Sequence, residues 1–351
     1  MTTIDLSKQE NKKQLSRQNT ILSSYNTKNQ NMHTLMNQLI KPLKISSRMH
    51  PSSSFSSVSI DIVRDLQEVK ERIVAVLQSN STDAIHLQPF LIPKHIKQLQ
   101  VQQLQDHDEG KGDDKGDDKY LLQNCASKNG LNRLLDVFDD NTTALVRVEM
   151  GTSYMDTNIQ TINLPIHQFS QYLRLLQEQQ TKAKEEEEEE ADDNSNNNTP
   201  IAPIVYLAQQ SLQEIVPHIP LPVSLDILNN HEAAYDIYSN VSWIGPNNTF
   251  SPFHTDPHHN SFEQCLGSKS FRLINPMDSK KIQRSKLPNQ KNTIGASVDL
   301  KNVDVMEVVV GEGEELFMPS HWMHEVTSVI DASRPICVSN TTWWRSRNSI
   351  K

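Results

Sequence analysis

The sequence is poor in the residues that define several classes of protein. It has 3 cysteines and 10 glycines in 351 residues, and aromatic residues make up only 6% of it. An odd number of cysteines without a CxxC pair is a poor disulfide framework and favours a reducing compartment. So little glycine excludes a collagen-like chain. No apolar run approaches the roughly 18–20 residues that a membrane-spanning helix needs, so we expect no membrane association.

The chain also lacks an excess of basic residues. Its 34 Lys and Arg face 43 Asp and Glu, for a net charge of −9. Much of the acidity lies in residues 106–119 and 185–193, and the remainder is close to neutral. This excludes a basic nucleic-acid clamp and leaves nucleic acid a possible but not a favoured partner. The N-terminus has no apolar secretory core, so we expect an intracellular protein, in the nucleus or the cytoplasm.

Low-complexity segments divide the chain into three predicted parts. Residues 1–58 are rich in Ser, Asn, Gln and Lys, so we predict a disordered polar arm. A helical segment at 59–128 follows, with an acidic loop at 106–119. The main folded domain is predicted at 129–347, with a low-complexity acidic insertion at 183–199.

Apolar periodicity predicts the elements within these parts. Apolar residues recur every three or four positions from Ile60 to Leu77, which predicts a helix over 60–78, and a second helix is expected at 129–139. From Ala144 onwards, short strand-like segments are separated by Pro, Gly and Asn turns, about 10–20 residues apart. This spacing favours an all-β barrel or jelly roll over a parallel sheet with intervening helices.

His254 and Asp256 are the first candidate ligands of a metal ion. Side chains at i and i+2 of a strand point to the same face, so the imidazole and the carboxylate can reach one point. A histidine, a carboxylate and a second histidine with open positions describe a non-haem Fe(II) site. The pattern is weak by itself, because it occurs a second time at His107 and Glu109. A structural polar pair is therefore the alternative.

Lys269 strengthens the hypothesis of a ligand site. In the predicted strand GSKSFRLI it shares an apolar face with Phe271 and Leu273. A lysine on such a face is costly unless it meets an anion, and no acid stands at i±2 along this face. A ligand carboxylate is the predicted partner, and the alternative is a side chain that extends to the sheet edge.

The second histidine ligand is expected on a later strand. The segment GEELFMPSHWMHEVTSV offers His321 and His324. We favour His324, since it opens a predicted strand and can face back into the barrel, and His321 stays as an alternative. His258 and His259 are disfavoured as a zinc site because no cysteine stands nearby. The tandem Trp343–Trp344 is expected to pack rather than to form a substrate cage.

These motifs resemble a known family. The segment SWIGPNNTFSPFHTDPHHNSFEQCLGSKSFRLINP resembles the iron-binding half of the JmjC-domain 2-oxoglutarate oxygenases, and GEGEELFMPSHWMHEVTSV and ICVSNTTWW resemble their closing strands. Among them, the small JmjC-only hydroxylases are the most similar, from about residue 130 to residue 345. The resemblance implies a mainly β fold, a double-stranded β-helix of the jelly-roll or cupin-like type, with flanking helices and disordered polar segments. It identifies 129–347 as the JmjC/cupin-like catalytic domain.

The resemblance also implies the roles of site residues. It makes three side chains the Fe(II) ligands, namely His254, Asp256 and His324. Lys269 would pair with the distal carboxylate of 2-oxoglutarate. Three further side chains would hydrogen-bond the same cosubstrate: Tyr206, Ser251 and Asn260. Hydroxyl and amide groups suit this task, because a dianion in an apolar barrel needs several donors.

The implied activity is hydroxylation of a protein side chain, with arginine or lysine favoured. It would use O2 as cosubstrate and release succinate and CO2, with a protein or peptide as the substrate partner. Related alternatives are hydroxylation of a tRNA base and demethylation of N-methyl-lysine. An alternative of another class is a catalytically silent JmjC-like binding module, which the presence of all three ligand types and of the lysine disfavours.

Overall fold

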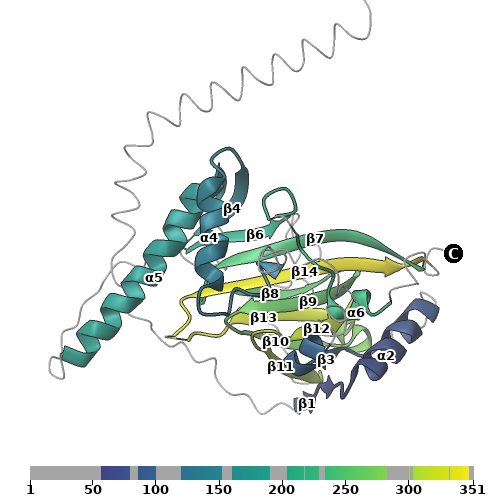
Figure 1. Cartoon of the computed structure of the whole chain (residues 1–351). Helices are drawn as coiled ribbons and strands as arrows, with labels where there is room; N and C mark the ends of the chain where they lie inside the picture. The colour runs from purple at the N-terminus through teal and green to yellow at the C-terminus, as the bar shows by residue number, and fades with distance from the viewer. Residues whose placement is uncertain are drawn as a thin grey trace, which may run out of the picture. The chain divides into compact units, whose positions relative to one another are not determined.

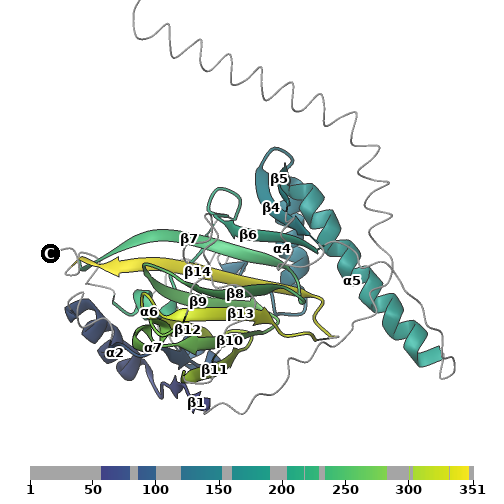
Figure 2. The ribbon, with the colours of Figure 1, turned by 180° about the vertical axis from the view of Figure 1, so that it is seen from behind.

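Two β-sheets form the centre of the part of the chain that the structure describes (Figure 1 and Figure 2). The structure is a computed structural model, and it describes residues 57–79, 86–99, 120–151, 160–189, 204–216, 218–228, 234–282, 300, 303–331 and 333–347. The predicted acidic loop, most of the predicted arm and residues 190–199 of the predicted insertion lie outside these residues. The three predicted parts of the chain therefore stay predictions.

The smaller sheet has five strands, in the order β1 (Ser57–Ser59), β11 (Val305–Val310), β10 (Lys269–Ile274), β13 (Met323–Ser328) and β8 (Phe250–Thr255). The larger sheet has nine, in the order β2 (Asp61–Ile62), β3 (Phe90–Ile92), β12 (Glu315–Met318), β9 (His259–Leu266), β14 (Ile336–Ser346), β7 (Tyr235–Pro246), β6 (Ile204–Gln210), β4 (Leu145–Gly151) and β5 (Gln160–Pro165). Among the described strands, all pairings are antiparallel except those of β1 with β11 and of β2 with β3. The predicted mainly β, jelly-roll architecture is confirmed.

The core between the sheets is apolar because each strand turns alternate side chains inward. Phe262 of the larger sheet and Phe271 of the smaller sheet meet edge to face, with ring centroids 4.8 Å apart. Leu273, Leu316 and Trp322 belong to the same buried cluster. Side chains from both sheets thus fill the interior, and the polar residues that remain there need a specific partner.

Helices cover the outer face and one edge of the larger sheet (Figure 1). Helix α2 (Leu66–Gln78) packs Val69 and Ile73 against Phe317 and Trp344. Helices α4 (Gly130–Asp140) and α5 (Ile166–Glu189) lie side by side near β4 and β5, and two short helices are α6 (Val223–Asp226) and α7 (Pro276–Ser279). Helix α4 confirms the helix predicted at 129–139. Among the described residues, no helix combines the length and the apolar character needed to cross a membrane.

The helix predicted over 60–78 is wrong over its first turn and a half, because α2 begins only at Leu66. Asp65 is extended, with φ −156°, and its carboxylate accepts a hydrogen bond from the backbone N–H of Glu68 at 2.8 Å. This is an N-cap, which starts a helix and leaves the residues before it free to be extended. Those residues form β1 and β2, and Ile60 between them is buried in the core between the sheets. Apolar spacing alone does not distinguish a helix from two short strands.

Candidate metal centre

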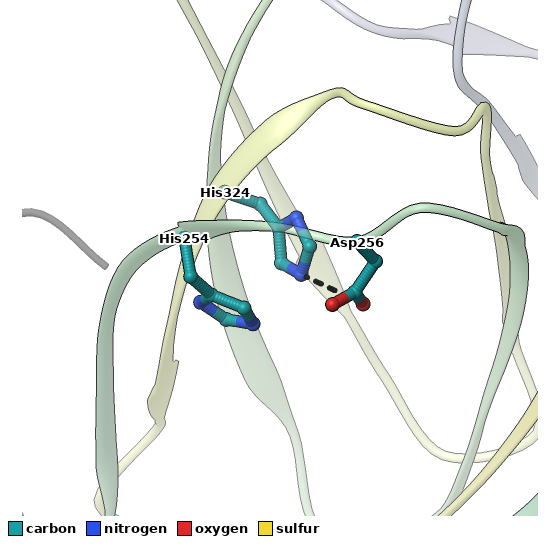
Figure 3. A group of neighbouring side chains, drawn as sticks. All are labelled: His254, Asp256 and His324. Carbon is teal, nitrogen blue, oxygen red and sulfur yellow. Dashed lines mark ion pairs between the residues drawn. The ribbon is translucent and has the colours of Figure 1, made fainter. Parts of the chain in front are cut away.

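Neighbouring strands of the smaller sheet bring two histidines and an aspartate together. His254 on β8 and His324 on β13 are direct register partners, and their ring centroids are 4.2 Å apart. Asp256 follows directly after the end of β8. One ligand atom from each of these three side chains lies within 4.8 Å of the others, and Figure 3 shows the side chains converging. In the described part of the chain this is the one group of at least three His, Cys, Asp or Glu that suits a metal ion.

Backbone carbonyls orient both imidazoles. Nδ1 of His254 is 2.7 Å from the carbonyl oxygen of Pro252, and Nδ1 of His324 is 3.0 Å from that of Trp322. A carbonyl oxygen only accepts, so Nδ1 carries the proton in each ring. The lone pair of each Nε2 is then available to a metal, which is the usual second-sphere arrangement of a ligating histidine.

The protonation state of His324 also suits a ligand. Burial, with a smaller contribution from His254, lowers the pKa of His324 to about 4, although Asp256 opposes the shift. The imidazole is therefore neutral near pH 7. The contact drawn in Figure 3 between Nε2 of His324 and Oδ2 of Asp256, at 3.7 Å, has the separation of an ion pair. Because this imidazole is neutral, the contact is one between two ligand groups that face the same point.

Trp343 is a residue of this site that the sequence did not reveal. Its indole N–H donates a hydrogen bond to Oδ2 of Asp256 at 3.2 Å, and its ring meets that of Trp243 edge to face. The expectation that the tandem tryptophans pack rather than form a substrate cage did not include this hydrogen bond of Trp343. Trp344 is fully buried in the cluster under α2, so the prediction is right there. Alternation along β14 suggests that the two rings face opposite ways, but not which one meets the carboxylate.

Lys269 is a buried cation at the start of β10. It is only 4% exposed, and its Nζ donates a hydrogen bond to the hydroxyl of Tyr206 at 3.1 Å. Nζ also lies 5.6–5.9 Å from the ring centroids of Tyr206, Trp243 and Phe262. Burial lowers the pKa of Lys269. No carboxylate among the described residues forms an ion pair with it, so the cation is desolvated without an anion.

The position of Tyr206 depends on a glycine in the next strand. A Cβ atom at Gly245 of β7 would lie 2.6 Å from Cδ2 of Tyr206, which no real contact allows. The absence of a side chain there lets the phenol ring lie across β7 towards Lys269. Burial raises the pKa of Tyr206 well above its usual value, so the hydroxyl stays protonated.

A β-bulge places Ser251 on the same face as the candidate ligands His254 and His324. His324 pairs with His254 and Val326 pairs with Ser251, so three steps along β8 match two steps along β13. In a regular strand, residues three apart lie on opposite faces. The extra residue of the bulge places Ser251 on the same face as His254. The structure gives the Ser251 hydroxyl no hydrogen bond to any described residue.

Asn260 of β9 is buried, at 5% exposed, opposite Met318 and Trp343. Its Oδ1 has no hydrogen-bond partner among the described residues. A buried amide oxygen without a partner is costly, so this atom is an orphan that a ligand can satisfy. Of the predicted cosubstrate residues, Tyr206 contacts Lys269 directly. Within the described chain, no hydrogen bond joins Ser251 or Asn260 to Tyr206 or Lys269.

The other histidines of the two motifs lie outside the group. His321 sits in the turn before β13 with φ 67°, and it is His324 that joins His254 and Asp256. His258 stacks on Tyr238, with ring centroids 4.3 Å apart. His259 accepts a hydrogen bond at Nδ1 from the backbone N–H of Ser320. The disfavoured zinc pair His258 and His259 therefore forms no metal-suited group among the described residues.

Two facing sheets, with two histidines and a carboxylate where β8 and β13 meet, define a cupin-like protein. The chain belongs to the cupin-like domain family, whose model matches residues 2–350. Jumonji C domain-containing protein 5 of Drosophila melanogaster is 30% identical over 155 residues, which cover 40% of this chain and 37% of that protein. Lysine-specific demethylase 8 of Danio rerio is 30% identical over 152 residues, or 40% and 36% of the two chains. Lysine-specific demethylase JMJ30 of Arabidopsis thaliana is 30% identical over 122 residues, or 31% and 26%.

The similarity to JmjC-domain proteins that the motifs predicted is thus confirmed. The chain spans between about a quarter and two fifths of the length of these relatives. Family and relatives support the class of 2-oxoglutarate oxygenases. They do not separate a hydroxylase from a demethylase.

Proposed function

We propose that this protein is an Fe(II)- and 2-oxoglutarate-dependent oxygenase that hydroxylates a protein side chain, with arginine or lysine favoured. The single observation that carries the proposal is the convergence of His254, Asp256 and His324 in a barrel that also holds a buried lysine, with which no carboxylate of the described residues pairs. Metal ligands alone suit several chemistries, and a buried cation alone suits any anion. Their combination suits a metal ion together with a carboxylate cosubstrate.

The donor set fits Fe(II). Two imidazoles with available Nε2 atoms and one carboxylate are the ligands of non-haem Fe(II) oxygenases, and they leave coordination positions open. The group contains no cysteine, which is the ligand that softer metals would prefer. We assign the three metal ligands to His254, Asp256 and His324, with Trp343 fixing the carboxylate through its hydrogen bond to Oδ2.

The neighbouring residues fit 2-oxoglutarate. Lys269 offers a desolvated cation to a carboxylate, and the Tyr206 hydroxyl beside it can turn its proton to the same anion. Rotation of the Asn260 amide would turn its N–H group, a donor, towards a ligand carboxylate, which only accepts. The hydroxyl of Ser251 lies on the same strand face as His254. Aromatic walls exclude water, which strengthens each of these contacts.

Fe(II) bound with 2-oxoglutarate and O2 supplies the oxidising chemistry that hydroxylates a C–H bond, and succinate and CO2 are the coproducts. The contribution of the chain is to hold and orient. The triad and Trp343 fix the metal position, Lys269 fixes the cosubstrate, and the apolar core shields the reacting atoms from water.

A cationic side chain is the substrate that the surroundings favour. Glu149 of β4 is the register partner of Tyr206, so its carboxylate projects from the same face of the larger sheet. The rings of Trp243 and Trp343 lie 6.5 Å apart beside the metal ligands. A carboxylate and aromatic faces together suit arginine or lysine. Since two relatives are named lysine-specific demethylases, demethylation of N-methyl-lysine is the second candidate.

Two alternatives stay less favoured. A silent binding module is disfavoured because all three ligand types and the buried lysine are present. A tRNA-base hydroxylase is disfavoured because the chain has no excess of basic residues. We also propose an intracellular setting, in the nucleus or the cytoplasm. The three cysteines, which are all free and buried, support it.

The experiment combines the purified full-length protein with Fe(II), 2-oxoglutarate and libraries of arginine- and lysine-containing peptides, with and without N-methyl groups. We expect succinate release and a peptide that gains one oxygen atom. Loss of a methyl group instead would select the demethylase, and modification only of tRNA would select the base hydroxylase. Absence of both 2-oxoglutarate binding and succinate release would overturn the oxygenase assignment.

A further inference from the structure

Two turns that cross between the sheets meet beside the candidate metal centre. Residues 256–258 connect β8 of the smaller sheet to β9 of the larger sheet. Residues 319–322 connect β12 of the larger sheet back to β13 of the smaller one. The first turn begins with Asp256, and the second ends two residues before His324. The relative position of these two ligands therefore depends on how the turns are held.

Two hydrogen bonds hold the second turn, one to the first turn and one to the first residue of β9. The backbone N–H of His321 donates to the carbonyl oxygen of Asp256 at 2.8 Å. The backbone N–H of Ser320 donates to Nδ1 of the His259 side chain at 3.1 Å. The first of these bonds needs no particular side chain, whereas the second needs an acceptor at position 259.

The second turn is held in a conformation that its sequence does not favour. His321 has φ 67°, in the left-handed region that residues other than glycine rarely occupy. Such a residue persists only where its surroundings determine it, and strained residues cluster at functional sites. The hydrogen bonds to Asp256 and to His259 are contacts that hold the second turn there.

His259 is built into the fold as an acceptor. It is 4% exposed, and its ring lies against Trp344 and Phe317, with centroid distances of 4.9 and 6.0 Å. Burial lowers the pKa of His259 to about 4, so the ring is neutral near pH 7 and Nδ1 keeps its lone pair. The sheet thus fixes the ring, and the ring fixes Ser320.

The far end of the second turn reaches the metal ligand. The carbonyl oxygen of Trp322 accepts the hydrogen bond from Nδ1 of His324 at 3.0 Å. The Trp322 side chain is buried between the sheets, and its indole N–H donates to the carbonyl oxygen of Leu87 at 3.0 Å. The turn is therefore anchored near its start by His259 and at its end by the Trp322 ring. The carbonyl group of Trp322 orients His324.

We propose that His259 is a positioning residue of the metal centre, which sets the place of His324 relative to Asp256 through Ser320 and the turn 319–322. It is not a metal ligand. The inference rests on the proposed function, since it takes His254, Asp256 and His324 to bind Fe(II). It adds a requirement for a neutral acceptor at a position outside the triad.

Two substitutions of His259 separate positioning from packing. His259→Phe keeps a ring between Trp344 and Phe317 but removes the acceptor. His259→Asn loses the ring but places an amide oxygen close to the position of Nδ1. The full-length chain is titrated with Fe(II) under anaerobic conditions against a chromophoric chelator, and the melting temperature of each metal-free variant is recorded. Neither readout requires turnover.

We expect His259→Phe to bind Fe(II) about 10–100-fold more weakly than wild type, which is the usual effect of removing an outer-sphere partner. We expect His259→Asn to stay within a few-fold of wild type, although it melts at a lower temperature. His258→Leu, which removes the neighbouring histidine at the end of the first turn, serves as the matched control and should leave Fe(II) affinity unchanged. His259→Met, also without a nitrogen acceptor, takes the place of His259→Phe if that variant does not fold.

The opposite pattern overturns the inference. Wild-type affinity in His259→Phe or His259→Met, or an affinity loss in His259→Asn as large as in the acceptor-free variants, shows that the acceptor does not position the site. Failure of the proposed function looks different, because the wild-type chain itself would then not bind Fe(II).

Discussion

Nζ of Lys269 donates a hydrogen bond to the Tyr206 hydroxyl at 3.1 Å, and no carboxylate of the described residues forms an ion pair with that lysine. The contact joins β10 of one sheet to β6 of the other across the barrel. A phenol only partly replaces the water that a buried ammonium group has lost. The lysine is therefore expected to lower the stability of the ligand-free protein and to gain most when an anion binds.

Substitution of Lys269 tests this directly. Loss of one partner of a buried charge pair costs about 2–5 kcal/mol, so we expect Lys269→Met to bind 2-oxoglutarate at least about 30-fold more weakly. Fe(II) affinity should be kept, and the melting temperature without ligand should not fall. Isothermal titration with 2-oxoglutarate gives the first result and anaerobic Fe(II) titration the second. An unchanged 2-oxoglutarate affinity would refute the assignment of Lys269 as the carboxylate partner.

The choice between His321 and His324 can be tested by metal binding. His324→Ala removes a predicted ligand, so we expect Fe(II) binding to be lost. His321→Gly keeps the backbone N–H that bonds Asp256 and removes only the side chain, so Fe(II) affinity should stay the same. The stability of His321→Gly should differ from that of the wild type by less than about 1 kcal/mol. Glycine removes the backbone strain at φ 67°, and this offsets its greater conformational freedom in the unfolded chain. Loss of metal in His321→Gly would exchange the two assignments.

The tandem tryptophans provide a matched pair of variants. Trp343→Phe removes the indole donor to Asp256, so we expect Fe(II) affinity to fall about 10-fold or more with little change in melting temperature. Trp344→Phe removes a hydrogen bond to Ser261 and buried area under α2, so we expect a loss of roughly 1–3 kcal/mol in stability with metal binding kept. Equal effects of the two variants on metal affinity would contradict the role given to Trp343.

Glu315, one of two neighbouring buried carboxylates on the outer face of the larger sheet, gives a pH dependence. Glu315 of β12 and Glu263 of β9 are register partners, and Nζ of Lys97 is 2.6 Å from Oε1 of Glu263. Glu315 accepts hydrogen bonds from the backbone N–H groups of Val223 and Ser224 at the start of α6. Burial, with a smaller contribution from Glu263, raises the pKa of Glu315 to about 7, against an ordinary value of 4.5.

This raised pKa predicts the direction of a stability change. Between pH 4.5 and pH 7 the unfolded chain loses the proton of this carboxyl while the folded chain keeps it, so this group favours folding less as pH rises. We expect Glu315→Gln to remove that contribution, which is on the order of 2–3 kcal/mol between pH 5 and pH 8. Urea unfolding of wild type and variant at both pH values measures the difference. If the stabilities of the two proteins change in parallel, Glu315 does not titrate in this range.

Much of the fold follows from the sequence because strand alternation and turn residues are local. Alternation places Lys269 with Phe271 and Leu273, and the structure buries all three. The same rule puts His254 and Asp256 on one face. Capping is harder to foresee, since Asp65 decides where α2 begins and the apolar pattern continues through it.

The rest of the site depends on contacts between strands distant in sequence. The bulge opposite His324, which returns Ser251 to the ligand face, exists only in the pairing of β8 with β13. The donation from Trp343 to Asp256 joins residues 87 positions apart. Likewise, the hydrogen bond from Ser320 to His259 requires the turn 319–322 to meet the start of β9. A single sequence shows which side chains can do this chemistry but not which strands and turns become neighbours.

The proposed function requires three side chains and a metal ion to turn over 2-oxoglutarate in this chain. Its most direct test is succinate release by the full-length protein with Fe(II) and 2-oxoglutarate, compared with His254→Ala and Asp256→Ala. We expect release by the wild type, stimulation by a substrate peptide, and loss of release in both variants, which should remain folded. Equal release by the variants, or none by a wild-type protein that also fails to bind 2-oxoglutarate, would contradict the claim.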